Sequence, residues 1–440
     1  MFKRAIGIAL ALIGLIVGAG FASGQEMLQY FVAFGTNGLW GVALAAIIMI
    51  IGSIAMMQLS SHLQAREHTM VFDRVTHPIV ARFLDIATLV TLFGIGFVMF
   101  AGGGANLNQQ FGWAPWVGTT LMMLLVMAVG MLDVDKVSAV IGAVTPFIIL
   151  MIVGTAAYTL ATADFDLSGL GAVASTEVAS SLPNWWLSAF NYVGLSLIVA
   201  VSMAMVIGGN NLDSRAAGIG GLLGGLCFAL LLAAATLTIF LRVDEVAHDD
   251  MPMLSVVTGI HPALGIVMTF TIFMMIFNTA LGLFYALAKR LTRNNPSRFR
   301  AVYIASVLVG FVLGFLPFKD LVSYVYPVLG YAGIILAFTL SIAWVRGRTT
   351  IRKEYRRRHR IRELLTRKLD PTQRFSRKDA AALSKATAAS NLPDDQLTEA
   401  MTQEVTEELS DDSEDTGASS DSGNARDAED SRAAGQQPRP

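Results

Sequence analysis

The sequence predicts an all-α integral membrane protein with ten transmembrane helices and a polar C-terminal tail. Apolar residues make up 54% of the 440 positions, charged residues make up 15%, and the mean hydropathy is +0.57. Soluble domains carry about a quarter charged residues. The charges are also uneven, because residues 1–345 hold 14 Lys/Arg and 15 Asp/Glu whereas residues 346–440 hold 18 of each. This composition excludes a water-soluble enzyme, and the single cysteine excludes a disulfide scaffold.

The membrane helices are predicted from the apolar stretches. A helix that crosses a bilayer needs about 20 predominantly apolar residues. The stretches that meet this requirement are 5–34, 38–61, 82–104, 114–132, 137–161, 185–208, 216–241, 262–288, 301–317 and 320–345. Residues 1–346 therefore form one predicted transmembrane domain.

The positive charges predict the orientation of this domain, since cytoplasmic loops are enriched in Lys and Arg. With a cytoplasmic N-terminus, only Arg242 and Lys319 fall in outside loops. The inside loops then hold Lys3, Arg4, Arg66, Arg74, Arg82, Lys136, Arg215, Lys289, Arg290, Arg293, Arg298 and Arg300. We therefore expect a multi-pass protein of the cell membrane with both termini in the cytoplasm.

The tail has two predicted parts. Residues 347–369 are basic, with the run Arg356-Arg357-Arg358-His359-Arg360, and next to a membrane helix such a segment attracts anionic lipid headgroups rather than nucleic acid. Residues 370–440 are rich in Ser, Asp, Glu and Ala, and this composition predicts a disordered acidic segment. No feature of the sequence defines an oligomeric state.

The first apolar stretch contains the most irregular segment, Gly18-Ala19-Gly20-Phe21-Ala22-Ser23-Gly24-Gln25-Glu26. Within a bilayer, backbone that leaves the helix is tolerated only inside protein or beside a cavity, so such a segment marks a site. Close helix packing explains the glycines but not Ser23, Gln25 and Glu26 at membrane depth. The segment predicts a broken helix whose restarted half directs free N–H groups at an anionic substrate group.

Glu26 has two open interpretations. An ionised carboxylate at this depth is costly unless it takes up a proton, meets a cation or faces a wet cavity. Glu26 then couples protons or binds a substrate ammonium group. Alternatively, it caps the first turn of the outer half-helix, where the helix dipole favours a negative charge.

The sixth apolar stretch is the expected counterpart of the first. Ten spans divide into two halves of five with opposite orientation, and transporters with inverted repeats bind their substrate between the first helices of the two halves. Asn191, Gly194 and Ser196 interrupt the apolar pattern here, beside Tyr192. The segment is either a second broken helix that lines the site or a straight helix in which Asn191 makes a hydrogen bond.

Further polar residues lie in or near the eighth and third stretches. Asn278 and Thr279 supply oxygen atoms that suit a sodium ion if they face Gly18 and Ala19 at the first break, or they make a helix-packing hydrogen bond. Asp85 is expected to reach the cytoplasmic surface or to pair with a loop arginine. The cytoplasmic residues His62, His68 and His77 lack metal-ligand spacing and are predicted to be solvated.

The nonapeptide Gly18–Glu26 resembles the opening signature of the YkvI-type bacterial membrane proteins, distant relatives of the amino acid/polyamine/organocation transporter superfamily. The resemblance covers residues 1–346. It implies the five-plus-five inverted repeat of the bacterial leucine/sodium symporter (the LeuT fold), with helices one and six unwound around the substrate. Ala19–Gly24 would then contact a substrate carboxylate, Asn191–Ser196 would form the other half of the site, and Asn278-Thr279 would lie at the sodium position.

Two departures leave the coupling ion open. The eighth stretch has no Thr-Ser or Ser-Ser pair, and the fifth stretch, Val137–Ala161, has no lysine to replace sodium. We expect no enzymatic activity and no cofactor, with Na⁺ or H⁺ as the coupling ion. The predicted function is secondary transport of a small amino-acid-like or organic-cation solute by alternating access. The alternative is a transporter-like sensor that binds a small ligand and signals through the tail.

Overall fold

The structure is a computed structural model that describes residues 2–132, 144–163, 165–370, 372–406 and 409. Every regular element among these residues is a helix, as the sequence predicts. The chain divides into two compact units, residues 1–347 and 348–440. Each unit is described by itself below.

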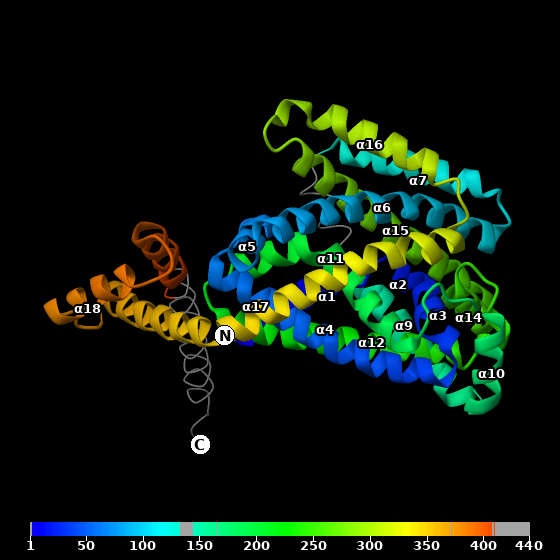
Figure 1. The fold of residues 1–440 in the computed structure, drawn as a ribbon, viewed down its shortest axis with the longest axis horizontal. Helices are drawn as coiled ribbons and strands as arrows, with labels where there is room; N and C mark the ends of the chain where they lie inside the picture. The colour runs from blue at the N-terminus through cyan, green and yellow to red at the C-terminus, as the bar shows by residue number, and fades with distance from the viewer. Residues whose placement is uncertain (1, 133–143, 164, 371, 407–408, 410–440) are drawn as a thin grey trace, which may run out of the picture. The chain divides into compact units, whose positions relative to one another are not determined.

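The first unit opens with an interrupted segment made of α1 (Phe2–Ile16), α2 (Ala19–Ser23), α3 (Gln25–Tyr30) and the 3₁₀ turn η1 (Val32–Phe34). Figure 1 shows the long helices that follow. They are α4 (Thr36–Leu63), α6 (Pro78–Phe111), α7 (Pro115–Gly130), α9 (Val144–Thr162), α11 (Trp185–Gly209), α12 (Ser214–Phe240), α15 (Pro262–Leu291), α16 (Phe299–Leu313) and α17 (Phe318–Leu369). Short elements connect them: α5 (His68–Val75), α10 (Leu167–Glu177), α13 (Val243–Val246), α14 (Pro252–Ile260) and η2 (Pro296–Arg298).

These helices correspond to the predicted apolar stretches. In the described part of the chain, eight helices are long and apolar enough to cross a membrane, and α7 and residues Arg4–Ile16 are shorter apolar helices. For the predicted fifth span, residues 137–143 and the nearby Lys136 lie outside the described residues, and α9 forms the remainder. The structure thus agrees with a multi-pass membrane protein, whereas the ten-span count and the inverted repeat remain predictions.

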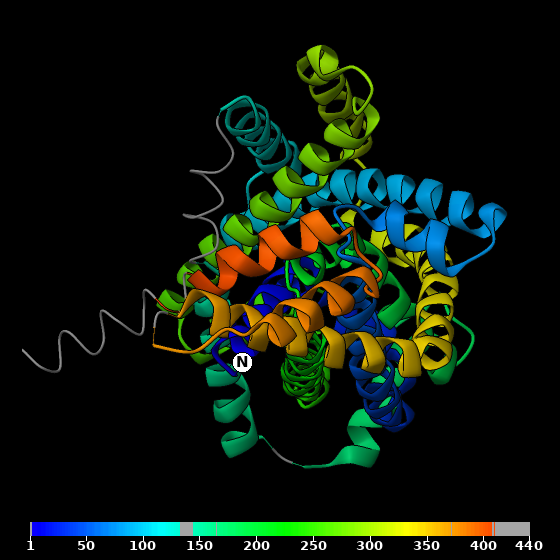
Figure 2. The ribbon, with the colours of Figure 1, turned by 90° about the vertical axis from the view of Figure 1, so that its left-hand side faces the viewer.

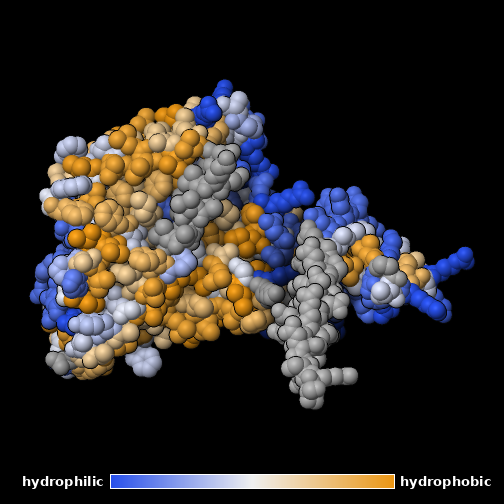
Figure 3. All heavy atoms as spheres, turned by 180° about the vertical axis from the view of Figure 1, so that it is seen from behind, coloured by the Kyte–Doolittle hydropathy of each residue, from blue (hydrophilic) through white to orange (hydrophobic). Residues whose placement is uncertain are grey.

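The surface of the first unit is that of a protein solvated by lipid. Large apolar side chains point outward along the long helices, including Ile79, Leu230 and Val312, which are 74%, 63% and 67% exposed. Figure 3 shows hydrophobic residues over most of the visible face of this unit. A water-soluble protein rarely exposes so large an apolar area, because the hydrophobic effect opposes it.

The helices of the first unit form two packed groups, which Figure 2 shows from a second side. The first helix group consists of α1, α4, α11 and α12, in which both α4 and α1 pack against α11 and α12. The second helix group consists of α6, α7, α15 and α16. The short helix α2 lies against α15, so the interrupted segment joins the first group to the second.

The sixth span is not broken, and this corrects the prediction for residues 191–196. Helix α11 is continuous from Trp185 to Gly209. The polar residues serve packing: the Asn191 amide donates to the carbonyl of Pro327 at 2.9 Å, and the Ser196 hydroxyl donates to the carbonyl of Tyr192 in its own helix. The alternative of a straight helix with an asparagine hydrogen bond is confirmed.

Glycine at position 194 has a packing role. A β-carbon at Gly194 would lie 2.6 Å from the backbone nitrogen of Ile334, and one at Gly333 would lie 2.0 Å from the carbonyl oxygen of Gly194. The backbones of α11 and α17 therefore touch, which is the close approach that small residues allow between membrane helices.

The second unit contains the end of α17 and further helices, which corrects the prediction of disorder for part of residues 370–440. Helix α18 spans Arg377–Ala388, and residues 394–406 are also helical. Ser376 and Asp379 form a capping box that satisfies backbone N–H groups at the start of α18. Residues 410–440 lie outside the described residues.

The second unit also buries apolar side chains. Its buried apolar residues are Ile351, Ile361, Leu364, Leu365, Leu397, Met401 and Val405. Glu354 accepts a hydrogen bond from the hydroxyl of Ser390, and the guanidinium of Arg358 donates to the side-chain oxygen of Asn391. These contacts offset the entropy that the chain loses on folding. The polar composition alone had predicted that this loss would keep the segment disordered. The basic run of residues 347–369 is thus also part of a folded unit.

The glycine contact between α11 and α17 predicts a stability effect. Gly194→Ala and Gly333→Ala should each lower the unfolding temperature, because overpacking costs about 1–3 kcal/mol. Gly282→Ala in α15 is the matched control, since no atom lies within 4 Å of its added β-carbon and alanine favours the helix. Thermal unfolding in detergent measures both. Equal unfolding temperatures for Gly194→Ala and Gly282→Ala would contradict the contact.

Candidate functional site

The predicted break in the first membrane segment is confirmed. Helix α1 ends at Ile16, Gly18 has an extended backbone, and the five-residue helix α2 follows. Gly24 then takes a left-handed conformation with φ = +82° before α3 begins. Only glycine adopts this conformation without steric cost, so the glycine positions explain where the helix stops and restarts.

Protein surrounds the break, and Ser23 satisfies part of its backbone groups. All five residues of α2 are buried. The hydroxyl of Ser23 donates to the carbonyl of Gly20 at 2.8 Å and accepts from the backbone N–H of Gln25 at 3.2 Å. Ser23 therefore replaces hydrogen bonds that the continuous helix would have made, as membrane interiors require.

Glu26 is the charged group at the break. Its carboxylate folds back over α2, since a β-carbon at Gly20 would lie 1.7 Å from Glu26 Oε1. Among the described residues, no cationic side chain forms an ion pair with this carboxylate. A carboxylate in this position has to be compensated by a proton, a bound cation or hydrogen-bond donors.

Three buried tyrosines lie near this carboxylate, and we call Glu26, Tyr30, Tyr192 and Tyr326 the Glu26 cluster. Tyr192, on α11, is close enough for its hydroxyl to interact with the carboxylate. Tyr30 on α3 and Tyr326 on α17 lie close enough to interact with it electrostatically. The ring centroids of Tyr30 and Tyr192 are 5.4 Å apart.

Hydrogen bonds hold the cluster in place. The hydroxyl of Tyr30 donates to the side-chain oxygen of Asn191 at 3.2 Å. The side-chain nitrogen of Asn191 in turn donates to the carbonyl of Pro327, the residue after Tyr326. The hydroxyl of Ser188 donates to the carbonyl of Tyr30 at 2.6 Å. Asn191 thus positions Tyr30, and its contact with a substrate stays a prediction.

Aromatic rings continue from the cluster toward α2 and α12. The ring of Phe228 stacks with Tyr192 at a centroid distance of 6.4 Å and contacts Phe21 of α2 at 5.5 Å. Neither Phe228 nor Tyr326 is among the site residues predicted from the sequence. A tyrosine followed by proline inside an apolar span was the available signal for Tyr326; nothing in the sequence distinguishes Phe228 from other core phenylalanines.

Gln25 adds an unsatisfied polar group at the break. Its side chain is fully buried, and neither its amide nitrogen nor its amide oxygen has a hydrogen-bond partner in the described part of the protein. Leaving a buried amide unsatisfied costs about 1–3 kcal/mol. Such a group marks a position where a ligand or water supplies the missing bonds.

Some of the residues that were predicted to bind sodium lie near one another. A β-carbon at Gly18 would be 3.6 Å from the hydroxyl oxygen of Thr279, and α2, which begins at Ala19, packs against α15. Thr269 and Thr271 donate to carbonyls of their own helix. Asn278 and Thr279, by contrast, are half-buried and make no hydrogen bond with another described residue. Their oxygen atoms are therefore available to a cation.

A small pocket adjoins the cluster. It shares Tyr30 with the Glu26 cluster. Its lining residues are Gln29, Tyr30, Ser180, Ser181, Leu182, Val322, Ser323 and Pro327. The lining is rich in hydroxyl and amide groups, which suits a polar solute.

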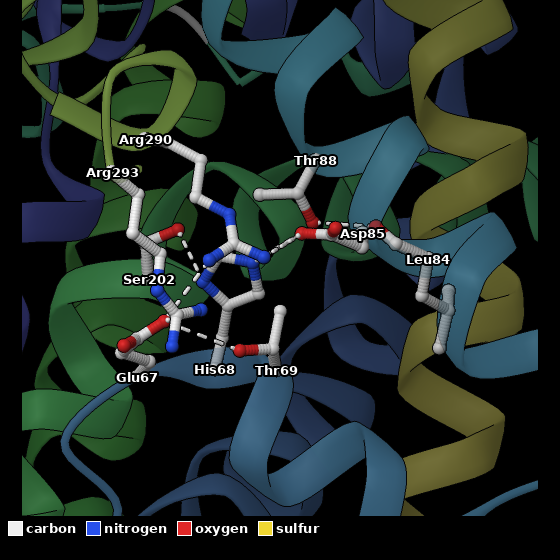
Figure 4. Close-up of polar contacts among 9 residues, drawn as sticks. All are labelled: Glu67, His68, Thr69, Leu84, Asp85, Thr88, Ser202, Arg290 and Arg293. Atoms are coloured by element: carbon white, nitrogen blue, oxygen red, sulfur yellow. Dashed lines mark hydrogen bonds and ion pairs between the residues drawn. The ribbon is translucent and has the colours of Figure 1, made fainter. Parts of the chain in front are cut away.

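A second polar cluster lies away from the break and corrects one prediction. His68 is buried, not solvated, and its ring lies between Asp85 and Ser202. Asp85 pairs with Arg290 at 2.9 Å, which confirms the predicted pairing with a loop arginine. Figure 4 shows this cluster.

Known proteins were compared with the chain. No family model matches it. It is 24% identical to the uncharacterized membrane protein YkvI of Bacillus subtilis (strain 168) over 327 residues, which cover 74% of this chain and 92% of YkvI. It is 25% identical to the uncharacterized protein YyaD of the same organism over 334 residues, which cover 76% of this chain and 95% of YyaD.

Two solved structures share the fold. The inward-facing conformation of Mhp1 matches with a TM-score of 0.52 and 13% identity, covering 91% of each chain. The crystal structure of MhsT in complex with L-phenylalanine matches with a TM-score of 0.52 and 14% identity, covering 90% of this chain and 96% of MhsT. Of the two relatives, YkvI is described as a membrane protein. The chain is therefore similar to the YkvI-type bacterial membrane proteins over most of its length, and it shares the fold of the LeuT-type transporters.

Proposed function

We propose that the protein is an ion-coupled secondary transporter of a small solute that carries an ammonium group, an amino acid or an organic cation, and that it works by alternating access. The observation that carries the proposal is the half-buried carboxylate of Glu26, which has no cationic partner in the described residues and lies near three buried tyrosines. An ammonium group satisfies such a carboxylate, and aromatic faces attract cations as well. The LeuT fold of the neighbours supports the transporter class.

The site has a place for each end of an amino acid. The Glu26 cluster would receive the ammonium group. The buried amide of Gln25, which has no hydrogen-bond partner in the described residues, would receive a carboxylate. The pocket that shares Tyr30 would be the entry from the outside, in the orientation with both termini in the cytoplasm.

The coupling ion has two candidates in the same region. Glu26 would carry a proton when no ammonium group is present, since a carboxylate away from water favours its neutral form. Thr279 and Asn278, with backbone oxygen atoms of Gly18 and Ala19, offer the hard oxygen ligands that suit Na⁺. No group of three or more His, Cys, Asp or Glu residues that could hold a metal ion occurs among the described residues.

Glu26→Gln should abolish uptake that is driven by a proton gradient, because the amide neither titrates nor attracts an ammonium group. Uptake of radiolabelled L-phenylalanine and choline into proteoliposomes measures it. Asp320→Asn is the matched control, since it removes an exposed carboxylate at the start of α17. Uptake by Glu26→Gln that equals the wild type at every pH would contradict a role of Glu26 in coupling or binding. Binding of either probe without any flux would favour a receptor.

Gly20→Ala should weaken binding of the transported probe by at least about tenfold, since the added β-carbon occupies the place of the Glu26 carboxylate. Gly282→Ala is the control because its β-carbon meets nothing within 4 Å. Thermal shift against increasing probe concentration measures both affinities. Retained affinity in Gly20→Ala would show that this position of the carboxylate is unimportant for binding.

Thr279→Val should remove the stabilisation of the protein by NaCl relative to KCl if Na⁺ is the coupling ion. Thr271→Val is the matched control, because the Thr271 hydroxyl is already bonded to its own helix. Unfolding temperatures in the two salts provide the readout. Equal unfolding temperatures of the wild type in the two salts would exclude Na⁺ as the coupling ion and leave the proton as the candidate.

A further inference from the structure

The cluster in Figure 4 connects the two helix groups at one end of the first unit. His68 begins α5, which packs against α6, α11 and α4. One ring nitrogen, Nε2, lies 3.2 Å from Asp85 Oδ1 on α6, in the second helix group. The other, Nδ1, lies 3.1 Å from the hydroxyl of Ser202 on α11, in the first helix group. A single imidazole ring therefore bridges the two groups.

Ion pairs complete the connection. Arg290, in the last turn of α15, donates from Nη2 to Asp85 Oδ1 at 2.9 Å and from Nη1 to Glu67 Oε2 at 3.0 Å. Arg293 lies 2.8 Å from the same oxygen of Glu67. Two carboxylates thus face two guanidinium groups, and the charges balance only while His68 is neutral.

Both contacts of His68 fit the neutral ring. The carboxylate of Asp85 only accepts hydrogen bonds, so Nε2 carries a hydrogen, and in the neutral ring Nδ1 accepts from the Ser202 hydroxyl. Burial disfavours the charged ring and lowers the pKa of His68 below its usual value; the bond to Asp85 opposes this effect, and the charge of Arg290 adds to it. From α11 the facing group is the uncharged Ser202, and α4 carries no acidic or basic residue other than His62.

We propose that His68 is a proton-binding site that holds the two helix groups together when neutral and releases them when protonated. The inference rests on the proposed function, because alternating access requires the groups to move apart at one end. In the orientation with cytoplasmic termini, this is the cytoplasmic end.

The direction of the pH effect follows from linkage. In the released state, His68 is exposed to water and has its ordinary pKa of about 6.5. In the state in which His68 bridges the two helix groups, which we call the latched state, the pKa of His68 is lower. The latched state is therefore fully favoured above about pH 6.5 and loses its advantage as the pH falls below that value.

Distance measurements between spin labels test the proposal without a transport assay. Labels are placed at Met203→Cys on α11 and Leu291→Cys on α15, both exposed neighbours of the cluster, in a Cys227→Ser background and in lipid nanodiscs. We expect the population with the longer distance to rise between pH 8 and pH 5, because protonation of His68 favours the state in which its pKa is higher. His68→Gln should remove this response, whereas the exposed His77→Gln, the matched control, should keep it.

Ser202→Ala provides a second variant that leaves the titrating ring in place. It removes only the bond to α11, so release should begin at a higher pH. An unchanged pH response in His68→Gln, an unchanged midpoint in Ser202→Ala, or a wild type without a pH response would each overturn the proposal. Uptake measured in parallel separates the two hypotheses: transport without a distance change refutes the latch alone, and a distance change without transport of any probe refutes the proposed function alone.

Discussion

A carboxylate enclosed by protein at an interrupted membrane helix is the constraint on which the rest of the site depends. Neither the free backbone groups of the break nor the charge of Glu26 can be left to lipid. The surrounding residues meet this requirement in two ways. The Ser23 hydroxyl makes hydrogen bonds to the backbone on both sides of Gly24. Tyrosines from three separate helices lie near the carboxylate. What they do not supply is a positive charge. The missing charge is what makes the site suitable for a cationic solute or a proton.

Close packing of small residues makes this arrangement possible. The carboxylate of Glu26 lies where a side chain at position 20 would be, and α17 approaches α11 through Gly194 and Gly333. The second contact brings Pro327 within reach of Asn191, which also holds Tyr30. One pair of touching helices thus sets the position of two tyrosines in the cluster. Rigid support of this kind around an interrupted segment is what a selective site needs.

The same unit holds two polar centres with different character. The Glu26 cluster has one negative charge and no cation in the described residues, whereas the cluster around His68 has balanced ion pairs and joins both helix groups. A binding site for a charged solute and a structural contact between helices have opposite electrostatic requirements. The binding site needs a charged group without a partner of opposite charge in the protein, whereas the structural contact needs charges that are already paired.

The sequence alone determined the class of the protein, most of its apolar helices and the break at residues 18–24, because hydropathy, glycine and charge act locally. Only the tertiary structure decided the roles of residues whose partners are distant in the chain. Asn191 and Ser196 look the same in the sequence whether they open a helix or tie it to a neighbour, and the neighbour, α17, lies more than a hundred residues away. His68 appeared solvated because its partners Ser202 and Arg290 come from other helices. The tail appeared disordered because an average composition conceals the few apolar residues that meet in the folded second unit.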